Sequence, residues 1–240
     1  MSISPIRETE SFYPEYLTFQ KTVEAVNSFN SLFKIRRKGA KGGPSTHAQQ
    51  DLNRAMLVFA CAGLDVLVKR LVKAKLSRLI EADKTVNEKF KEFVKRGLGK
   101  DDKALLNTIA LALVDSNPKQ MLVTEYIGTM TEDSLQSVPE LQRVSNAAGL
   151  QTKVIFTNER MNRLKDAFIV RNQIIHEMDI SITDGKGKGP GHRTRRQRIS
   201  RDMEQHTKEI LDLGQELLVA FKERFAVLKI DVQKATATST

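Results

Sequence analysis

The stretch AMLVFACAGLDVLVKRLV, residues 55–72, decides the fold class. Its apolar residues recur three and four positions apart, and up to Val68 they extend almost all the way round a helix. A helix that is apolar on all sides belongs in the centre of a protein, and this one is too short to span a bilayer, which needs about 20 residues. We therefore predict a central helix over residues 45–80, with one charge, Asp65, in its most apolar window.

Helical spacing continues through most of the chain, and strict apolar alternation is absent, so the sequence predicts an all-α protein. We expect an N-terminal helix and basic loop over 1–44, a helical bundle over 45–232 and a disordered tail over 233–240. The other long helices are expected at 14–34, 157–178 and 200–230, and Thr157 or Asn158 is a good N-cap for the second of them. An insertion over about 83–150, packed on the bundle, should hold short helices near 86–96, 102–115, 120–130 and 139–148.

The composition limits the class of protein. Cys61 is the only cysteine, so no intramolecular disulfide is possible, and its apolar neighbours indicate a buried, inert thiol. The four histidines are too scattered for a metal site, and we expect no metal and no cofactor. The start, MSISPIRETESFYPEY, does not resemble a signal peptide, so we expect a cytoplasmic protein without a membrane partner.

The charge favours a polyanion partner, since the net charge is +10 and the pI about 9.7. With 6% aromatic residues and no tryptophan, however, a platform for stacking bases is not indicated. The stretch 185–198, GKGKGPGHRTRRQR, carries six lysines and arginines without an acid, and its glycines and proline predict a flexible basic loop. A solvated loop, or one that contacts an acidic partner, is the alternative to a nucleic-acid site.

The stretch FIVRNQIIHEMD, residues 168–179, places polar side chains in an otherwise apolar helix. On a helical wheel Arg171 falls near the middle of the apolar arc, and Asn172 and His176, four residues apart, stack on its edge. Residues of these types can bind and protonate a phosphodiester. The alternatives are an arginine held in a structural ion pair and a histidine satisfied in the core.

The segment RNQIIH, Arg171 to His176, resembles the R-x4-H signature of HEPN domains, in which a polar residue commonly follows the arginine. Its place in the third core helix, before a long last helix, also fits. The segment 55–72, with Asp65, is similar to an early core helix of RiboL-PSP-type HEPN domains. The resemblance covers roughly residues 45–80 and 157–230 and leaves 83–150 unexplained.

The resemblance implies an RNase that needs no metal and that works as a homodimer, with two R-x4-H motifs in one cleft. His176 would exchange a proton with the RNA, Arg171 would stabilise the phosphoryl oxygens and Asn172 would hold the imidazole or a phosphate oxygen. Such families usually serve as toxins or in anti-phage defence, and an inhibitor or antitoxin protein is a further partner to look for. A tyrosine that some HEPN toxins carry two residues after the histidine is Met178 here, so inactivation by its modification is not expected.

Supporting roles follow from position. Asp65 is expected to meet Arg171 across the two inner helices, unless it is exposed on a helix edge. The loop after the motif is expected to hold RNA phosphates through four arginines, with His192 as a weaker addition: Arg193, Arg195, Arg196 and Arg198. Two other hypotheses remain open, a non-catalytic HEPN module that binds RNA or protein, and a helical scaffold in which the motif is accidental.

Overall fold

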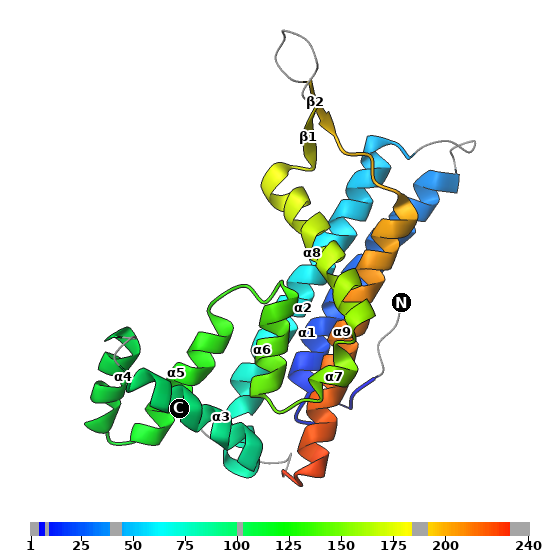
Figure 1. Ribbon diagram of the computed structural model, residues 1–240. Helices are drawn as coiled ribbons and strands as arrows, with labels where there is room; N and C mark the ends of the chain where they lie inside the picture. The colour runs from blue at the N-terminus through cyan, green and yellow to red at the C-terminus, as the bar shows by residue number, and fades with distance from the viewer. Residues whose placement is uncertain (1–4, 8–9, 39–44, 100–102, 184–191, 231–240) are drawn as a thin grey trace.

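Helix α2 (His47–Ala82) runs through the centre of the computed structural model, as residues 55–72 predict, and α1 (Tyr13–Lys38) and α9 (Ser200–Val227) lie along it (Figure 1). The structure describes residues 5–7, 10–38, 45–99, 103–183 and 192–230. Over these ranges it is all-α apart from one small hairpin, which confirms the predicted fold class. None of the helices described is both long enough and apolar enough to cross a membrane.

Six further helices complete the described fold: α3 (Lys84–Gly97), α4 (Lys103–Leu113), α5 (Pro118–Thr131), α6 (Val138–Ala147), α7 (Thr152–Ile155) and α8 (Asn158–Glu177). Helix α8 packs on α2 and α9, and α6 and α7 lie beside it. Helices α3, α4 and α5 pack on one another and project to one side of the bundle, where α3 and α5 also contact α2 (Figure 1). We call this group the α3–α5 lobe.

Side chains at the helix starts fix where the main elements begin. Thr46 caps α2 and exchanges hydrogen bonds with Gln49, which is a capping box. Thr157 caps α8, as its sequence predicts. Asp83 ends α2 and begins α3, because its carboxylate accepts hydrogen bonds from two backbone N–H groups in the first turn of α3. Asp83 is therefore the only residue of the chain between α2 and the lobe, and it is itself 5% exposed.

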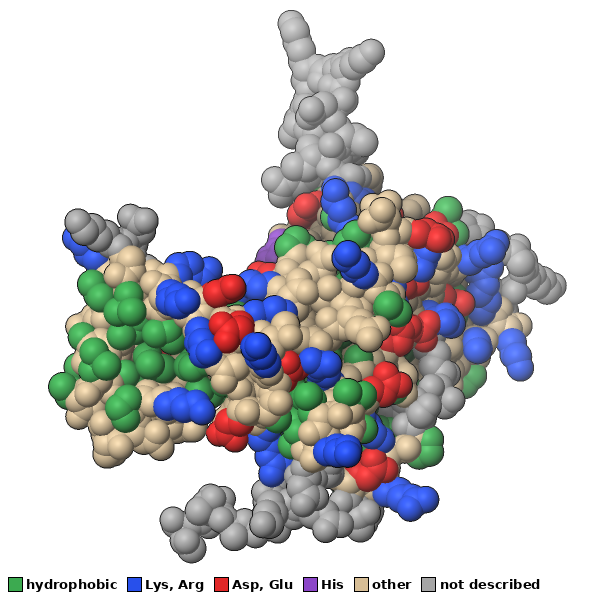
Figure 2. Space-filling model, turned by 60° about the horizontal axis from the view of Figure 1, so that its bottom comes forward, with side chains coloured by type: hydrophobic (Ala, Val, Ile, Leu, Met, Phe, Trp, Pro, Cys, Tyr) green, Lys and Arg blue, Asp and Glu red, His purple; other side chains and the backbone are tan. Residues whose placement is uncertain are grey.

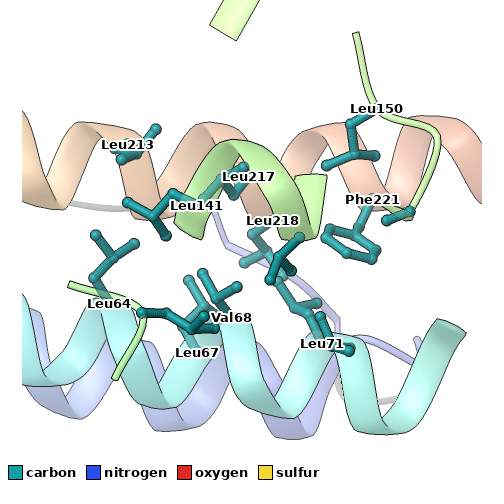
Figure 3. Packing of buried hydrophobic residues seen from close by; sticks show 14 of the residues in the cluster. Leu64, Leu67, Val68, Leu71, Leu141, Leu150, Leu213, Leu217, Leu218 and Phe221 are labelled. Atoms are coloured by element: carbon teal, nitrogen blue, oxygen red, sulfur yellow. The ribbon is translucent and has the colours of Figure 1, made fainter. Parts of the chain in front are cut away.

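One cluster of buried apolar side chains extends from α1 through α2 and the lobe to α9. Figure 3 shows its centre, where Leu64 and Leu67 of α2 lie opposite Leu217 and Phe221 of α9, with Leu141 of α6 between the two helices. Burial of each such side chain contributes about 1.5–3 kcal/mol, so this contact fixes α9 along the central helix.

Gly214 lets α1 approach α9 closely. A Cβ atom placed there would lie 2.3 Å from Cζ of Phe19, whose ring is completely buried. We expect Gly214→Ala to lower the free energy of unfolding by about 1–3 kcal/mol in urea titrations, because the ring cannot move aside without overpacking the core. Gly128→Ala is the matched control, since its Cβ would meet only Oε1 of Glu132 at 3.5 Å. An added methyl there should be neutral or should stabilise α5 by up to about 1 kcal/mol.

Two predictions are wrong, the end of the first helix and the conformation of the loop 185–198. Helix α1 continues four residues past Lys34, since the basic residues of its last turn interact favourably with the helix dipole. The predicted flexible loop 185–198 instead contains a strand, β2 (His192–Arg195), which pairs antiparallel with β1 (Ile180–Thr183). The β-branched residues of β1 favour this conformation. Residues 185–191 of the predicted loop, and the predicted tail 233–240, lie outside the described residues.

Candidate active site at the end of helix α8

Helix α8 carries the three predicted catalytic residues, and its two halves differ in burial. In the first half Leu164, Ala167 and Phe168 are buried in the core. From Arg171 to the end of the helix no side chain is fully buried, and Asn172 is exposed. The helix is thus anchored by its first turns and presents the predicted motif at the surface.

Arg171 is half-buried against the central helix. Its Nη1 donates a hydrogen bond of 2.9 Å to Oδ1 of Asn172, and its Nε is buried without a hydrogen-bond partner among the described residues. Burial raises the pKa of the Cys61 thiol to about 12, and the positive charge of Arg171 opposes this rise. The guanidinium therefore lies close to Cys61, which is fully buried and, with this pKa, protonated near neutral pH.

His176 lies in the last turn of α8 with an exposed side chain. Five residues separate it from Arg171, which corresponds to about 140° of rotation and 7.5 Å of rise. The structure brings Arg171 and Asn172 into contact, and Asn172 and His176 share one ridge of the helix. No hydrogen bond between described residues joins Arg171 to His176, so a single chain carries the two groups on one helix without contact between them.

Two consecutive left-handed residues end α8, Met178 with φ 51° and Asp179 with φ 55°. Asp179 is completely buried and lies between two arginines from distant elements. Its carboxylate accepts a hydrogen bond of 2.8 Å from Nε of Arg54, on α2, and one of 2.6 Å from Nη2 of Arg198, just before α9. Sequence analysis missed this cluster, although the final D of the quoted HEMD is one of its members.

Further hydrogen bonds complete the cluster. Arg54 also donates to the backbone carbonyl of Arg196 at 2.8 Å, and Arg198 also donates to Oε1 of Gln173 at 2.6 Å. Burial raises the pKa of Asp179, but the hydrogen bonds and charges of Arg198 and Arg54 outweigh it and hold that pKa below its usual value. The carboxylate is therefore ionised, and it ties α2, the end of α8 and the hairpin together.

The predicted RNA-binding arginines that the structure describes form ion pairs within the chain. Arg195 pairs with Asp51 at 3.0 Å, Arg196 pairs with Glu177 at 2.7 Å, and Arg198 belongs to the Asp179 cluster. These arginines hold the hairpin to α2 and α8, and their role in RNA binding stays a prediction. The side chains of the other two predicted residues lie outside the described part of the structure: His192 and Arg193.

The expected contact between Asp65 and Arg171 is not formed. Asp65 accepts a hydrogen bond of 2.6 Å from the backbone N–H of Leu135 and pairs with Lys69 at 3.2 Å. The reason is that Asp65 reaches the segment that links α5 to α6, and its other contact is with Lys69 on its own helix. Asp65 therefore fixes that link and does not orient the candidate catalytic arginine.

A groove of about 470 Å³ lies between α8 and α9 and contains His206, which sequence analysis did not single out. Burial lowers the pKa of His206, while the nearby carboxylates of Asp166 and Asp202 raise it in part. Neither carboxylate has an ion pair among the described residues, whereas Arg163 and Arg198 in the same groove are already paired. The free charges in the groove are negative, so it does not suit RNA, and the end of α8 remains the candidate site. The only signal for His206 in the sequence is its helical spacing from Asp202.

Comparison with models of protein families, with curated proteins and with solved structures finds no match. Among the described residues there is also no group of three or more His, Cys, Asp or Glu side chains placed to hold a metal ion. Function is therefore argued from the geometry at the end of α8.

Proposed function

We propose that the protein is a metal-independent endoribonuclease of the HEPN type that acts as a homodimer. The observation that carries the proposal is the exposed imidazole of His176, one and a half helical turns from the guanidinium of Arg171. The Nε of this guanidinium has no described partner, and Asn172 holds one of its terminal nitrogens. These groups supply a proton carrier and a fixed positive charge at one surface.

In the proposed reaction the nucleophile is a 2′-hydroxyl group of the RNA itself. The 2′-hydroxyl oxygen attacks the adjacent phosphorus, and the bond from phosphorus to the 5′-oxygen of the next nucleotide breaks. The imidazole of His176 takes the proton of the 2′-hydroxyl or gives one to the leaving 5′-oxygen. Arg171 donates hydrogen bonds to the phosphoryl oxygens as negative charge builds on them. The products are a 2′,3′-cyclic phosphate and a 5′-hydroxyl.

A second copy of the chain would supply what one chain lacks. In one chain the two groups point about 140° apart without contact, whereas a twofold axis near α8 would place Arg171 of each copy near His176 of the other. An apolar surface beside the motif supports this arrangement. On α2 Phe59 is 48% and Val66 is 41% exposed, with exposed Ala62 between them, and on α8 Ile175 is 38% exposed.

We propose that these residues form one patch, which we call the dimer face: Phe59, Ala62, Val66 and Ile175. The first three lie three and four residues apart on one face of α2, and Ile175 lies one turn after Arg171 on α8. A continuous apolar surface of this kind is typical of an interface between proteins.

We expect Val66→Glu to weaken self-association at least about tenfold, because a twofold interface would bring the two new carboxylates together in an apolar contact. Analytical ultracentrifugation over a range of concentrations measures this, and RNA cleavage should fall in parallel. Val154→Glu is the control, since that valine is 69% exposed on α7, away from the dimer face. A wild-type protein that stays monomeric, or a Val66→Glu variant that still dimerises normally, would contradict the proposed interface.

The function is tested by incubating the protein with single-stranded RNA in an excess of EDTA and by identifying the ends of the products. We expect cleavage to persist in the chelator and to yield 2′,3′-cyclic phosphate and 5′-hydroxyl ends. An RNA with one 2′-deoxynucleotide should resist cleavage at that position alone, because the attacking oxygen is missing there. Cleavage of DNA, or cleavage that requires a metal ion, would overturn the proposal.

A non-catalytic module of the same type is the second candidate. It is favoured by the absence of a contact between Arg171 and His176, and by the ion pairs that already occupy Arg195, Arg196 and Arg198. RNA binding without cleavage in the same assay would support it. A toxin or anti-phage role is proposed only on the resemblance, and growth arrest on overexpression that requires His176 would support such a role.

A further inference from the structure

The α3–α5 lobe contains two adjoining cavities of about 430 and 730 Å³, a size typical of sites for small molecules. They share four lining residues, Phe93, Arg96, Met130 and Arg143, and so form one space between α3, α4, α5 and α6. We call this space the lobe groove. It belongs to the insertion, for which neither the motif nor the RNase proposal gives a role.

Three cations line the lobe groove, and the described residues provide no ion pair for any of them. Arg143 donates from Nη1 to the carbonyl oxygen of Thr129 at 3.0 Å, and Lys89 donates to the carbonyl oxygen of Asn146. Arg96 is exposed and has no described hydrogen bond from its side chain. In this respect they differ from Arg195, Arg196 and Arg198, each of which pairs with a carboxylate.

Aromatic side chains form the floor of the lobe groove. The rings of Phe93 and Tyr126 lie 4.9 Å apart, and each residue is only 3% exposed. Burial raises the pKa of the Tyr126 hydroxyl, and the charges of Arg96 and Arg143, which line the same cavity, oppose this rise. Burial also lowers the pKa of Lys89, although Asp83 and Glu92 act in the opposite direction. The cations and rings therefore face one partly desolvated space.

Figure 2 shows the setting on the surface, where apolar side chains gather over the lobe and lysines and arginines border them. Two carboxylates, Glu92 and Glu125, also line the cavities, so the lining carries three positive and two negative side chains. The groove therefore offers an anion a few fixed cations next to an apolar, aromatic wall.

We propose that the lobe groove binds a nucleotide, with the base against Phe93, Tyr126 and Met130 and the phosphate between Lys89, Arg96 and Arg143. A guanidinium matches two phosphate oxygens in a fork, and Lys89, about two turns before Arg96 on α3, brings a third charge. An aromatic base is the ligand part that gains most from the apolar floor. This inference is independent of the RNase proposal, because none of its residues belongs to the α8 site.

Isothermal titration of the full chain tests the assignment, with AMP, GMP, CMP and UMP as probes and with adenosine, ribose 5-phosphate and inorganic phosphate as partial ligands. We expect a nucleoside monophosphate to bind at least about tenfold more tightly than either half of the ligand alone. Arg96→Gln and Arg143→Gln should each weaken that binding by at least about tenfold, since a charged hydrogen bond is lost. Lys119→Gln, an exposed lysine of the same lobe outside the lining, should change it by less than twofold.

The outcomes separate the alternatives. Binding is repeated in the His176→Ala variant, so that its result does not depend on cleavage, and circular dichroism confirms that each variant is folded. No binding of the four nucleotides at millimolar concentration overturns the proposal. So does binding that both arginine variants leave unchanged, or equal binding of inorganic phosphate. If an RNA oligonucleotide or an acidic peptide binds through Arg96 and Arg143 while the mononucleotides do not, the groove serves a macromolecule and the proposal fails.

Discussion

Asp179→Ala is expected to lower the free energy of unfolding by about 3–5 kcal/mol. The carboxylate is completely buried, and its removal leaves the guanidinium of Arg54, 5% exposed, with only the half-exposed carboxylate of Asp51 as an opposite charge. Arg198 loses its partner as well. Breaking a buried pair costs more than a surface pair contributes, because the remaining charge stays away from water. Urea titration followed by circular dichroism measures the loss.

Two controls separate charge from backbone. Asp179→Asn keeps the shape of the side chain, and asparagine tolerates the left-handed conformation at φ 55°. Its loss in free energy of unfolding should be smaller and reports the missing charge. Asp166→Ala removes an exposed aspartate from the same helix and should change the stability by no more than about 0.5 kcal/mol. A loss below about 1 kcal/mol for Asp179→Ala would show that the cluster does not hold α2, α8 and the hairpin together.

The pH dependence has a definite sign. The pKa of Asp179 in the folded protein is lowered below its unfolded value of about 3.9. The ionised carboxylate therefore stabilises the fold above that unfolded pKa, and this contribution is lost as the pH falls through the lower, folded value. The difference in stability between wild type and Asp179→Asn should be constant near neutral pH and should shrink below about pH 4.

His176→Ala is expected to reduce RNA cleavage by about 10²–10⁴-fold, because the proposed reaction loses the group that carries its proton. The side chain is exposed, so the stability should change by no more than about 0.5 kcal/mol. Initial rates on a defined RNA in EDTA give the ratio. His47→Ala removes another exposed histidine, on α2, and should cleave like the wild type.

Arg171 provides a second test of the same site. Arg171→Lys keeps the charge and loses the planar fork, so it should retain more activity than Arg171→Ala and less than the wild type. If His176→Ala cleaves within threefold of the wild type, the imidazole is not the proton carrier and the RNase proposal fails at this residue. Intact RNA binding by His176→Ala would assign the loss to chemistry and not to affinity.

The sequence predicted the helices because the apolar residues that a helix buries recur at a fixed period along the chain. Residues 55–72 indicated the central helix, and Thr157 indicated the start of α8, since caps act over three residues. The exposure of His176 could not be predicted from its place on a helical wheel. It depends on where α8 leaves the bundle, and that follows from packing against α2 and α9.

The partners of the supporting residues could not be predicted for a related reason. Asp65 and the loop arginines were assigned by charge and position, but ion pairs depend on which elements meet in space. Asp65 meets Leu135, 70 residues away, and Asp179 meets Arg54, 125 residues away. No local pattern marks such partners. The lobe groove likewise gathers residues from four helices, none of which forms a motif.

The sequence by itself determined that this protein is all-α, that residues 55–72 form its centre, and that Arg171, Asn172 and His176 share one helix, since all three follow from periodicity within a few turns of chain. Only the tertiary structure decided that Asp179 is the buried anchor at the end of that helix, that Arg195, Arg196 and Arg198 are paired, and that the lobe holds cations without a described ion pair beside aromatic rings. These features arise from contacts between distant segments, whose energies depend on burial and on the charge that each neighbour brings.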